Sequence, residues 1–221
     1  MTRLLEGVED AAEVLLVGGD LTNLGLLDEG EALLEAFQTI RLPIVAVLGN
    51  HDHESGQADA LADLLLDGGV HLLDGTAWEQ DGVGFAGVKG FGVGFTPHRL
   101  TPFGEQAIKD FVEVSVREAA ALDHALAGLG TRRRVAVLHY SPIASTLAGE
   151  PSQIFPFLGD SLLGEVLDRR GVEVAVHGHA HAGNLEGLTE GGVRVLNVSR
   201  QVLSRRSGGR AYVTFDVPAR P

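Results

Sequence analysis

The sequence predicts an α/β fold in which buried strands alternate with amphipathic helices. Short apolar runs rich in β-branched residues, such as 14–17 and 44–48, have the composition of buried strands. Between them, as at 28–40, apolar residues recur at helical spacing. Strand–helix alternation of this kind is typical of a parallel sheet. We expect one domain spanning 1–221, because no repeat or linker interrupts the pattern.

The first third of the chain supplies the clearest alternation. Leu33, Leu34, Phe37 and Ile40 share one face of the helix expected at 28–40. The elements expected here are a short helix at 2–12, strand 14–17, helix 28–40, strand 44–48 and helix 57–67.

The character changes after Gly68-Gly69, where short β-like segments are separated by Gly and Asp. These segments, at 70–73, 76–80 and 83–88, predict a meander or hairpins on a second sheet. The irregular loop at 91–104 either covers a functional site or packs on the surface. The later elements expected are helix 105–128, strand 135–138, a helix near 160–170, strand 172–176, and β segments at 185–189, 193–198 and 211–217.

The composition excludes several classes of function. The chain has no cysteine, so disulfides, thiolate metal sites and cysteine nucleophiles are excluded, and any metal must have nitrogen and oxygen ligands. A net charge of -13 disfavours nucleic acid as a partner. No apolar run is long enough to span a membrane, and acidic residues interrupt the N-terminus where a signal peptide would be apolar. We therefore expect a cytoplasmic protein without a membrane partner, and the oligomeric state stays open.

Polar side chains follow four of the expected strands. Asp20 follows the first, Asn50-His51-Asp52 the second, His139 a third and His177-Gly178-His179-Ala180-His181 a fourth. In open α/β sheets, ligands bind at the carboxyl ends of the strands. Asp, Asn and neutral His together suit a hard-to-borderline divalent ion. One such turn alone is equally well explained as a polar cap, but four of them predict a metal site.

These motifs together resemble the signature of the calcineurin-like metallophosphoesterase superfamily. Gly19-Asp20, Gly49-Asn50-His51-Asp52, His139 and Gly178-His179-Ala180-His181 follow in the family's order with similar spacing. The resemblance implies a four-layer α-β-β-α sandwich of two mixed sheets flanked by helices. It also implies a dinuclear metal centre between the sheet edges.

The resemblance further implies a role for each residue. Asp20 looks like the carboxylate that bridges two divalent ions. Asn50, His139 and His179 look like the other ligands of the second metal, and His181 looks like a ligand of the first. Manganese is the favoured ion, with iron, zinc, magnesium or cobalt as alternatives.

The implied reaction is hydrolysis of a small phosphodiester or phosphomonoester by a metal-bridging water or hydroxide. His51 looks like the catalytic imidazole that assists at the phosphate, and Asp52 like the carboxylate that orients it. His53, Glu54 and His177 receive no role beyond surface or packing. The alternative is a catalytically impaired binding or scaffold protein on the same fold. A nuclease is disfavoured by the acidic charge.

One family feature is missing. The resemblance implies a first strand ending in Asp-x-His upstream of Gly19-Asp20, but no histidine precedes His51 and no apolar strand precedes Val14. We therefore expect a domain without its first strand, in which the second-metal site is more complete than the first. A start codon assigned too far downstream or a truncation, a degenerate family member, and a strand supplied by another chain are the competing explanations.

Overall fold

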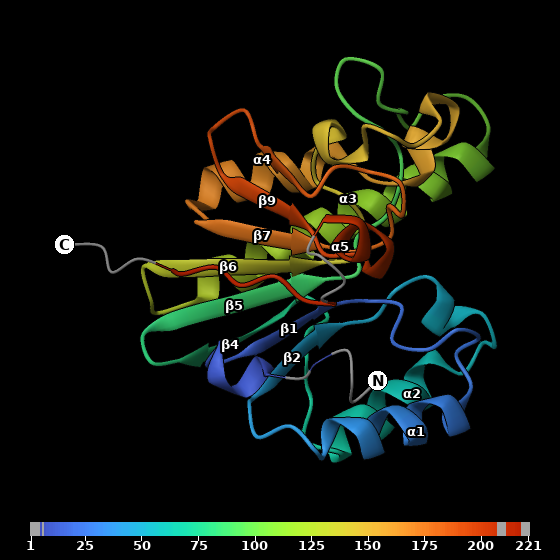
Figure 1. Cartoon of the computed structure of the whole chain (residues 1–221). Helices are drawn as coiled ribbons and strands as arrows, with labels where there is room; N and C mark the ends of the chain where they lie inside the picture. Colours follow the sequence, from blue (N-terminus) through green and yellow to red (C-terminus); the bar gives the residue numbers. More distant parts are fainter. Residues whose placement is uncertain (1–4, 6, 207–210, 218–221) are drawn as a thin grey trace.

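The computed structural model describes residue 5, residues 7–206 and residues 211–217. Two β-sheets pack face to face, and helices cover the outer face of each (Figure 1). The layers run α1 and α2, then the sheet containing β1 and β2, then the larger sheet, then α3 and α4 (Figure 1). The predicted four-layer α-β-β-α architecture is therefore confirmed. No described helix is both long and apolar enough to cross a membrane.

The smaller sheet is built from the first part of the chain. Its three strands pair in the order β1-β2-β3, and both pairings are parallel. Its elements are β1 (Leu15–Gly18), α1 (Leu27–Phe37), β2 (Ile44–Val47), α2 (Ala58–Asp67) and β3 (His71–Leu72).

The larger sheet has six strands in the order β4-β5-β6-β7-β9-β8. The four central strands are parallel, and an antiparallel strand closes each edge. Its strands are β4 (Thr76–Gln80), β5 (Val83–Val88), β6 (Arg133–Leu138), β7 (Val174–His177), β8 (Glu186–Leu188) and β9 (Arg194–Asn197). Its helices are α3 (Gln106–Gly128), α4 (Ser161–Arg170) and α5 (Arg200–Arg206).

Alternating side chains on the strands create separate apolar layers. In β2, Ile44 and Ala46 face α1 and α2, whereas Val45 and Val47 face the larger sheet. β6 does the same, with Val135 and Val137 between the sheets and its alternate residues against α3 and α4. Because a one-residue slip would exchange these faces, burial on both sides fixes the strand register.

Most expected elements are present, with four differences. The helix expected at 2–12 is, within the described residues, mainly the short 3-10 helix Val8–Asp10. β3, within the β segment expected at 70–73, belongs to the smaller sheet rather than the second one. Residues 211–217 form no strand, although Val213 and Phe215 pack between the sheets. α5 was not expected, because its polar sequence has no clear apolar stripe.

β1 is an edge strand in the described part of the chain. It pairs with β2 on one side only. A cavity of about 1290 Å³ lies along it, lined by β1 residues such as Leu16, by Val176 and Val198 of the larger sheet, and by 211–217.

The buried His177 at the end of β7 predicts a pH-dependent stability. Burial lowers the pKa of His177 to about 4, so between about pH 4 and 6.5 the unfolded chain binds more protons than the folded chain. The free energy of unfolding should therefore fall as pH decreases through this window, by about 1.4 kcal/mol per pH unit from this residue. Urea unfolding of metal-free protein at several pH values measures it.

His177→Gln should remove that contribution and flatten the pH dependence. His124→Gln, at an exposed position on α3, is the control and should leave the slope unchanged. An unaltered slope in His177→Gln would show that the histidine is protonated equally in both states.

Candidate metal centre

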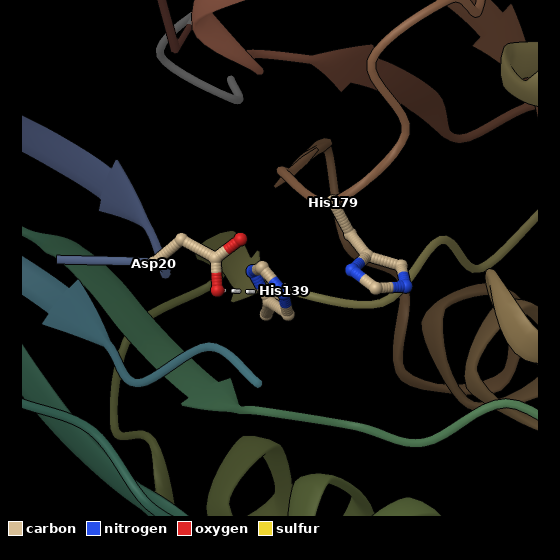
Figure 2. A group of neighbouring side chains, drawn as sticks. All are labelled: Asp20, His139 and His179. Carbon is tan, nitrogen blue, oxygen red and sulfur yellow. Dashed lines mark ion pairs between the residues drawn. The ribbon is translucent and has the colours of Figure 1, made fainter. Parts of the chain in front are cut away.

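The polar strand ends of both sheets meet at one point. Asp20 follows β1, whereas His139 and His179 follow β6 and β7 of the larger sheet. One ligand atom from each of these three residues lies within 4.8 Å of the others (Figure 2). Asn50, after β2, joins them, because its Oδ1 is 2.9 Å from Nε2 of His139. Four of the five predicted ligands are therefore brought together.

The contacts of His139 indicate which ring nitrogen is free. His139 is fully buried, and its Nδ1 lies 2.9 Å from the carbonyl oxygen of Gly18. A carbonyl only accepts, so Nδ1 can donate to Gly18, and a metal bound at Nε2, which also faces the Oδ1 atoms of Asn50 and Asp20, would select this tautomer. Burial also holds the pKa of His139 well below its usual range, so the ring is neutral near pH 7. In this tautomer Nε2 presents a bare lone pair, 3.3 Å from Oδ1 of Asp20.

His179 follows the same logic. Its Nε2 lies 3.1 Å from the carbonyl oxygen of Phe157 and donates to it. Burial lowers the pKa of His179 as well, so Nδ1 of the neutral ring is unprotonated. Figure 2 shows one ring nitrogen of His179 on the side of Asp20 and His139, and the other pointing away. The Phe157 carbonyl thus selects the tautomer, as protein groups around metal-binding histidines commonly do.

The converging atoms fit a divalent cation. The imidazole nitrogens of His139 and His179, a carboxylate oxygen of Asp20 and the amide oxygen of Asn50 all present lone pairs to one another. Burial raises the pKa of Asp20, because a carboxylate that is removed from water is less stable in its charged form. A bound cation would offset that cost. An Asp, Asn and two His ligands suit the borderline to hard divalent metals.

The backbone at the centre adopts conformations that few residues tolerate. Asp20 and His179 have φ values of 51° and 63°, in the left-handed region. Such strain persists only where the surroundings enforce it, and it concentrates at functional sites. Gly49 is required for a different reason, since a Cβ there would collide with both the backbone nitrogen and the carboxylate of Asp20.

Asp52 has a different role from the predicted one. It is fully buried and accepts hydrogen bonds from the backbone N–H groups of Leu21, Thr22 and Gly49, at 3.1, 2.8 and 2.7 Å. The expectation that Asp52 orients His51 is therefore wrong, because its oxygens are engaged by the backbone. Asp52 instead ties the turn after β1 to the turn after β2, and so positions Asp20.

His51 is exposed beside the centre. Its backbone N–H donates to Oδ1 of Asp20 at 3.0 Å, and its Nδ1 lies 2.9 Å from the carbonyl oxygen of Asn23. Asn23, rather than Asp52, therefore orients the ring and leaves Nε2 free. The loop carrying Asn23 is held by Glu29, whose carboxylate accepts from the N–H groups of Asn23 and Leu24.

The other polar residues after β2 and at the end of β7 lie outside the group. His181, the expected first-metal ligand, is exposed and lies outside the Asp20, His139 and His179 group. It lines the cavity beside β1 together with Asp20. His53 and Glu54 are exposed. His177 is buried and bonded to Thr146 at 2.9 Å, which agrees with a packing role.

Several groups near the centre were not foreseen from the sequence. The carbonyls of Gly18, Asn23 and Phe157 lie within hydrogen-bond distance of histidine rings. Because every residue has a backbone carbonyl, the residue type does not indicate such a contact. Tyr140 packs against His179, with ring centroids 4.4 Å apart and the rings tilted by 44°. Lys89 directly follows β5, so the strand-end pattern that identified the other polar residues applies to it equally.

The chain was compared with protein families, curated sequences and solved structures. A model of the calcineurin-like phosphoesterase family matches residues 1–183. The chain belongs to this family. No curated protein sequence matches the chain significantly.

Solved structures share the fold at low sequence identity. Phosphopantetheinyl hydrolase from Mycobacterium tuberculosis aligns with a TM-score of 0.64 and 18% identity, over 90% of this chain and 83% of that one. The protein TT1561 of Thermus thermophilus aligns with a TM-score of 0.58 and 13% identity, over 91% and 83%. At these identities the likeness concerns the fold.

Gly49→Ala should damage the centre, because its Cβ would displace Asp20. We expect Mn²⁺ affinity to fall at least tenfold and the free energy of unfolding to fall by about 1–3 kcal/mol, the usual cost of overpacking. Calorimetric titration and urea unfolding measure the two effects. Gly128→Ala, where a Cβ meets nothing, is the matched control and should be neutral. Normal Mn²⁺ binding by Gly49→Ala would contradict the close approach of the two turns.

Removal of a ligand should abolish stabilisation by metal. A metal that binds only the folded protein raises its melting temperature. Mn²⁺ should therefore raise the Tm of the parent protein, and His179→Gln should lose most of this shift. His53→Gln, at an exposed position outside the group, should keep it. Equal Tm shifts in both variants would exclude His179 as a ligand.

Proposed function

We propose that this protein hydrolyses a phosphodiester or phosphomonoester with the help of divalent metal ions, Mn²⁺ being the favoured ion. One observation carries the proposal: Asp20, Asn50, His139 and His179 direct unprotonated ligand atoms at one point in a calcineurin-like phosphoesterase fold. Bound divalent ions would neutralise charge on the phosphate and make a water molecule more acidic. The chain offers no cysteine for an alternative nucleophile.

Two metal sites are proposed, with unequal support. Asp20, Asn50, His139 and His179 would hold one ion, and the proximity of their ligand atoms supports this site. Asp20 and His181 would contribute to the second. His181 faces the same cavity as Asp20, which is the support for that assignment.

His51 is proposed as the residue that acts on the phosphate directly. The Asn23 carbonyl accepts from Nδ1–H and fixes the ring, which leaves Nε2 available; in the imidazolium form its N–H would donate to a phosphate oxygen or protonate the leaving group. Its exposed position next to Asp20 leaves room for a substrate. Asp52 contributes indirectly, by holding the backbone on either side of the centre.

The proposed substrate is a small phosphoester. One protein with this fold is a phosphopantetheinyl hydrolase, so an ester of that kind is a suitable second substrate after generic aryl phosphates. A non-catalytic binding protein is the alternative. The exposed Leu100 and Phe103, in the 91–104 loop, favour it, with side chains 38% and 83% exposed.

Hydrolysis of bis(p-nitrophenyl) phosphate in the presence of Mn²⁺ tests the proposal. His51→Ala should lower kcat about 10²–10³-fold, as expected for loss of one hydrogen-bond donor to the phosphate, and should change Mn²⁺ affinity little. Asp20→Ala should lose both turnover and Mn²⁺ binding. His53→Ala is the control and should resemble the parent protein. Tight Mn²⁺ binding without turnover on any phosphoester would instead favour the binding protein.

A further inference from the structure

Lys89 occupies an unusual position at the end of β5. It is one of the chain's two lysines, the other being Lys109 on α3. Its side chain is half-buried, and Nζ lies 5.4 Å from the ring centroids of both Phe91 and Tyr140. Lys89 has no part in the chemistry proposed above.

The ammonium group is incompletely paired. It donates one hydrogen bond, to the carbonyl of Gly90 at 3.0 Å, although an ammonium has three donors. Among the described residues, no carboxylate oxygen lies within 4.0 Å of it in an ion pair. The nearby carboxylates are Glu118, which accepts from the N–H of Gly90 at 2.7 Å, and Asp74. Burial lowers the pKa of Lys89, which reflects a charge removed from water without full compensation.

Lys89 lies next to the candidate metal centre. Its carbonyl oxygen accepts from the backbone N–H groups of His139 and Tyr140, at 3.1 and 3.0 Å, so its position is fixed relative to a metal ligand. The Tyr140 ring contacts both the Lys89 ammonium, 5.4 Å from its centroid, and the His179 ring, whose centroid is 4.4 Å away. One aromatic ring therefore links the ammonium to a candidate metal ligand.

The positive charge of Lys89 contrasts with the acidic charge of the rest of the protein. The protein carries a net charge of -13, which repels an anionic substrate. A half-buried cation beside the centre creates a local region of favourable potential. In such a partly desolvated setting, a charge-assisted hydrogen bond is stronger than at an open surface.

We propose that Lys89 is a specificity-determining residue that binds a second anionic group, carboxylate or phosphate, on the phosphoester substrate. The favoured substrates are then phosphoesters that carry another negative charge a few bonds from the scissile phosphate. This inference rests on the proposed function, because the scissile phosphate must be held at the metal centre.

Binding of non-hydrolysable phosphonates tests the proposal without turnover. The probes are butylphosphonate, 3-carboxypropylphosphonate and propane-1,3-bisphosphonate, titrated into the Mn²⁺-loaded full chain by calorimetry. The two probes with a second charge should bind about fivefold or more tighter than butylphosphonate, as expected for a partly buried ion pair. Lys89→Gln should remove that preference while leaving butylphosphonate affinity within about twofold, and Lys89→Arg should restore part of it. Lys109→Gln, at an exposed site, should keep it.

Competitive acetylation gives a second readout, because the chain has only two lysines. The two probes with a second charge should protect Lys89 from a water-soluble acetylating ester, detected by mass spectrometry, while Lys109 reacts normally. An unchanged preference in Lys89→Gln, or no protection of Lys89, would overturn the proposal and leave the phosphoesterase function standing. Failure of all three probes to bind, together with no hydrolysis, would overturn both.

Discussion

The hydrogen bond between His139 and the carbonyl of Gly18 joins the two sheets where the candidate metal centre forms. Gly18 ends β1 of the smaller sheet and His139 follows β6 of the larger one, so this bond links the two sheets. It orients the His139 ring and aims Nε2 at Asp20. The approach is possible because Gly178 leaves space, since a Cβ there would collide with the same Gly18 carbonyl. The position of each ligand therefore depends on how closely the two sheets meet.

The buried polar groups around the centre reduce the stability of the fold, and the packing of the apolar core does not require them. Two ligands hold left-handed backbone conformations, and burial lowers the pKa of His139 and His179 and raises that of Asp20. Each of these features destabilises the metal-free protein slightly. The lowered pKa values keep the imidazole nitrogens of His139 and His179 unprotonated near neutral pH, whereas the raised pKa of Asp20 is a cost that a bound cation would offset. The fold thus holds the candidate ligand side chains in position.

Much of this arrangement could be predicted from residue patterns, and the limits have physical causes. Apolar runs and helical periodicity identified the strands and most helices, because burial on both faces leaves a strong signal. Polar residues at the ends of strands identified Asp20, Asn50, His139 and His179. The role of Asp52 could not be predicted, because its partners are backbone N–H groups of a distant turn, and the same holds for the Asn23 carbonyl beside His51. Residues 211–217 have a strand-like sequence, but a strand also needs a hydrogen-bonded neighbour, which sequence alone does not reveal.

The open edge of β1 has a consequence for the energetics of the centre. In the part of the chain that the structure describes, β1 pairs only with β2, and Asp20 directly follows this four-residue strand beside a cavity of about 1290 Å³. An edge of this kind opens locally at a lower free energy than the central strands of the larger sheet. Each such opening moves Asp20 away from His139 and His179. The same local opening equilibrium of β1 therefore governs both the metal affinity of the centre and the amide-exchange protection of the strand. Interactions that keep this strand closed raise the metal affinity, and a bound metal slows amide exchange along the strand.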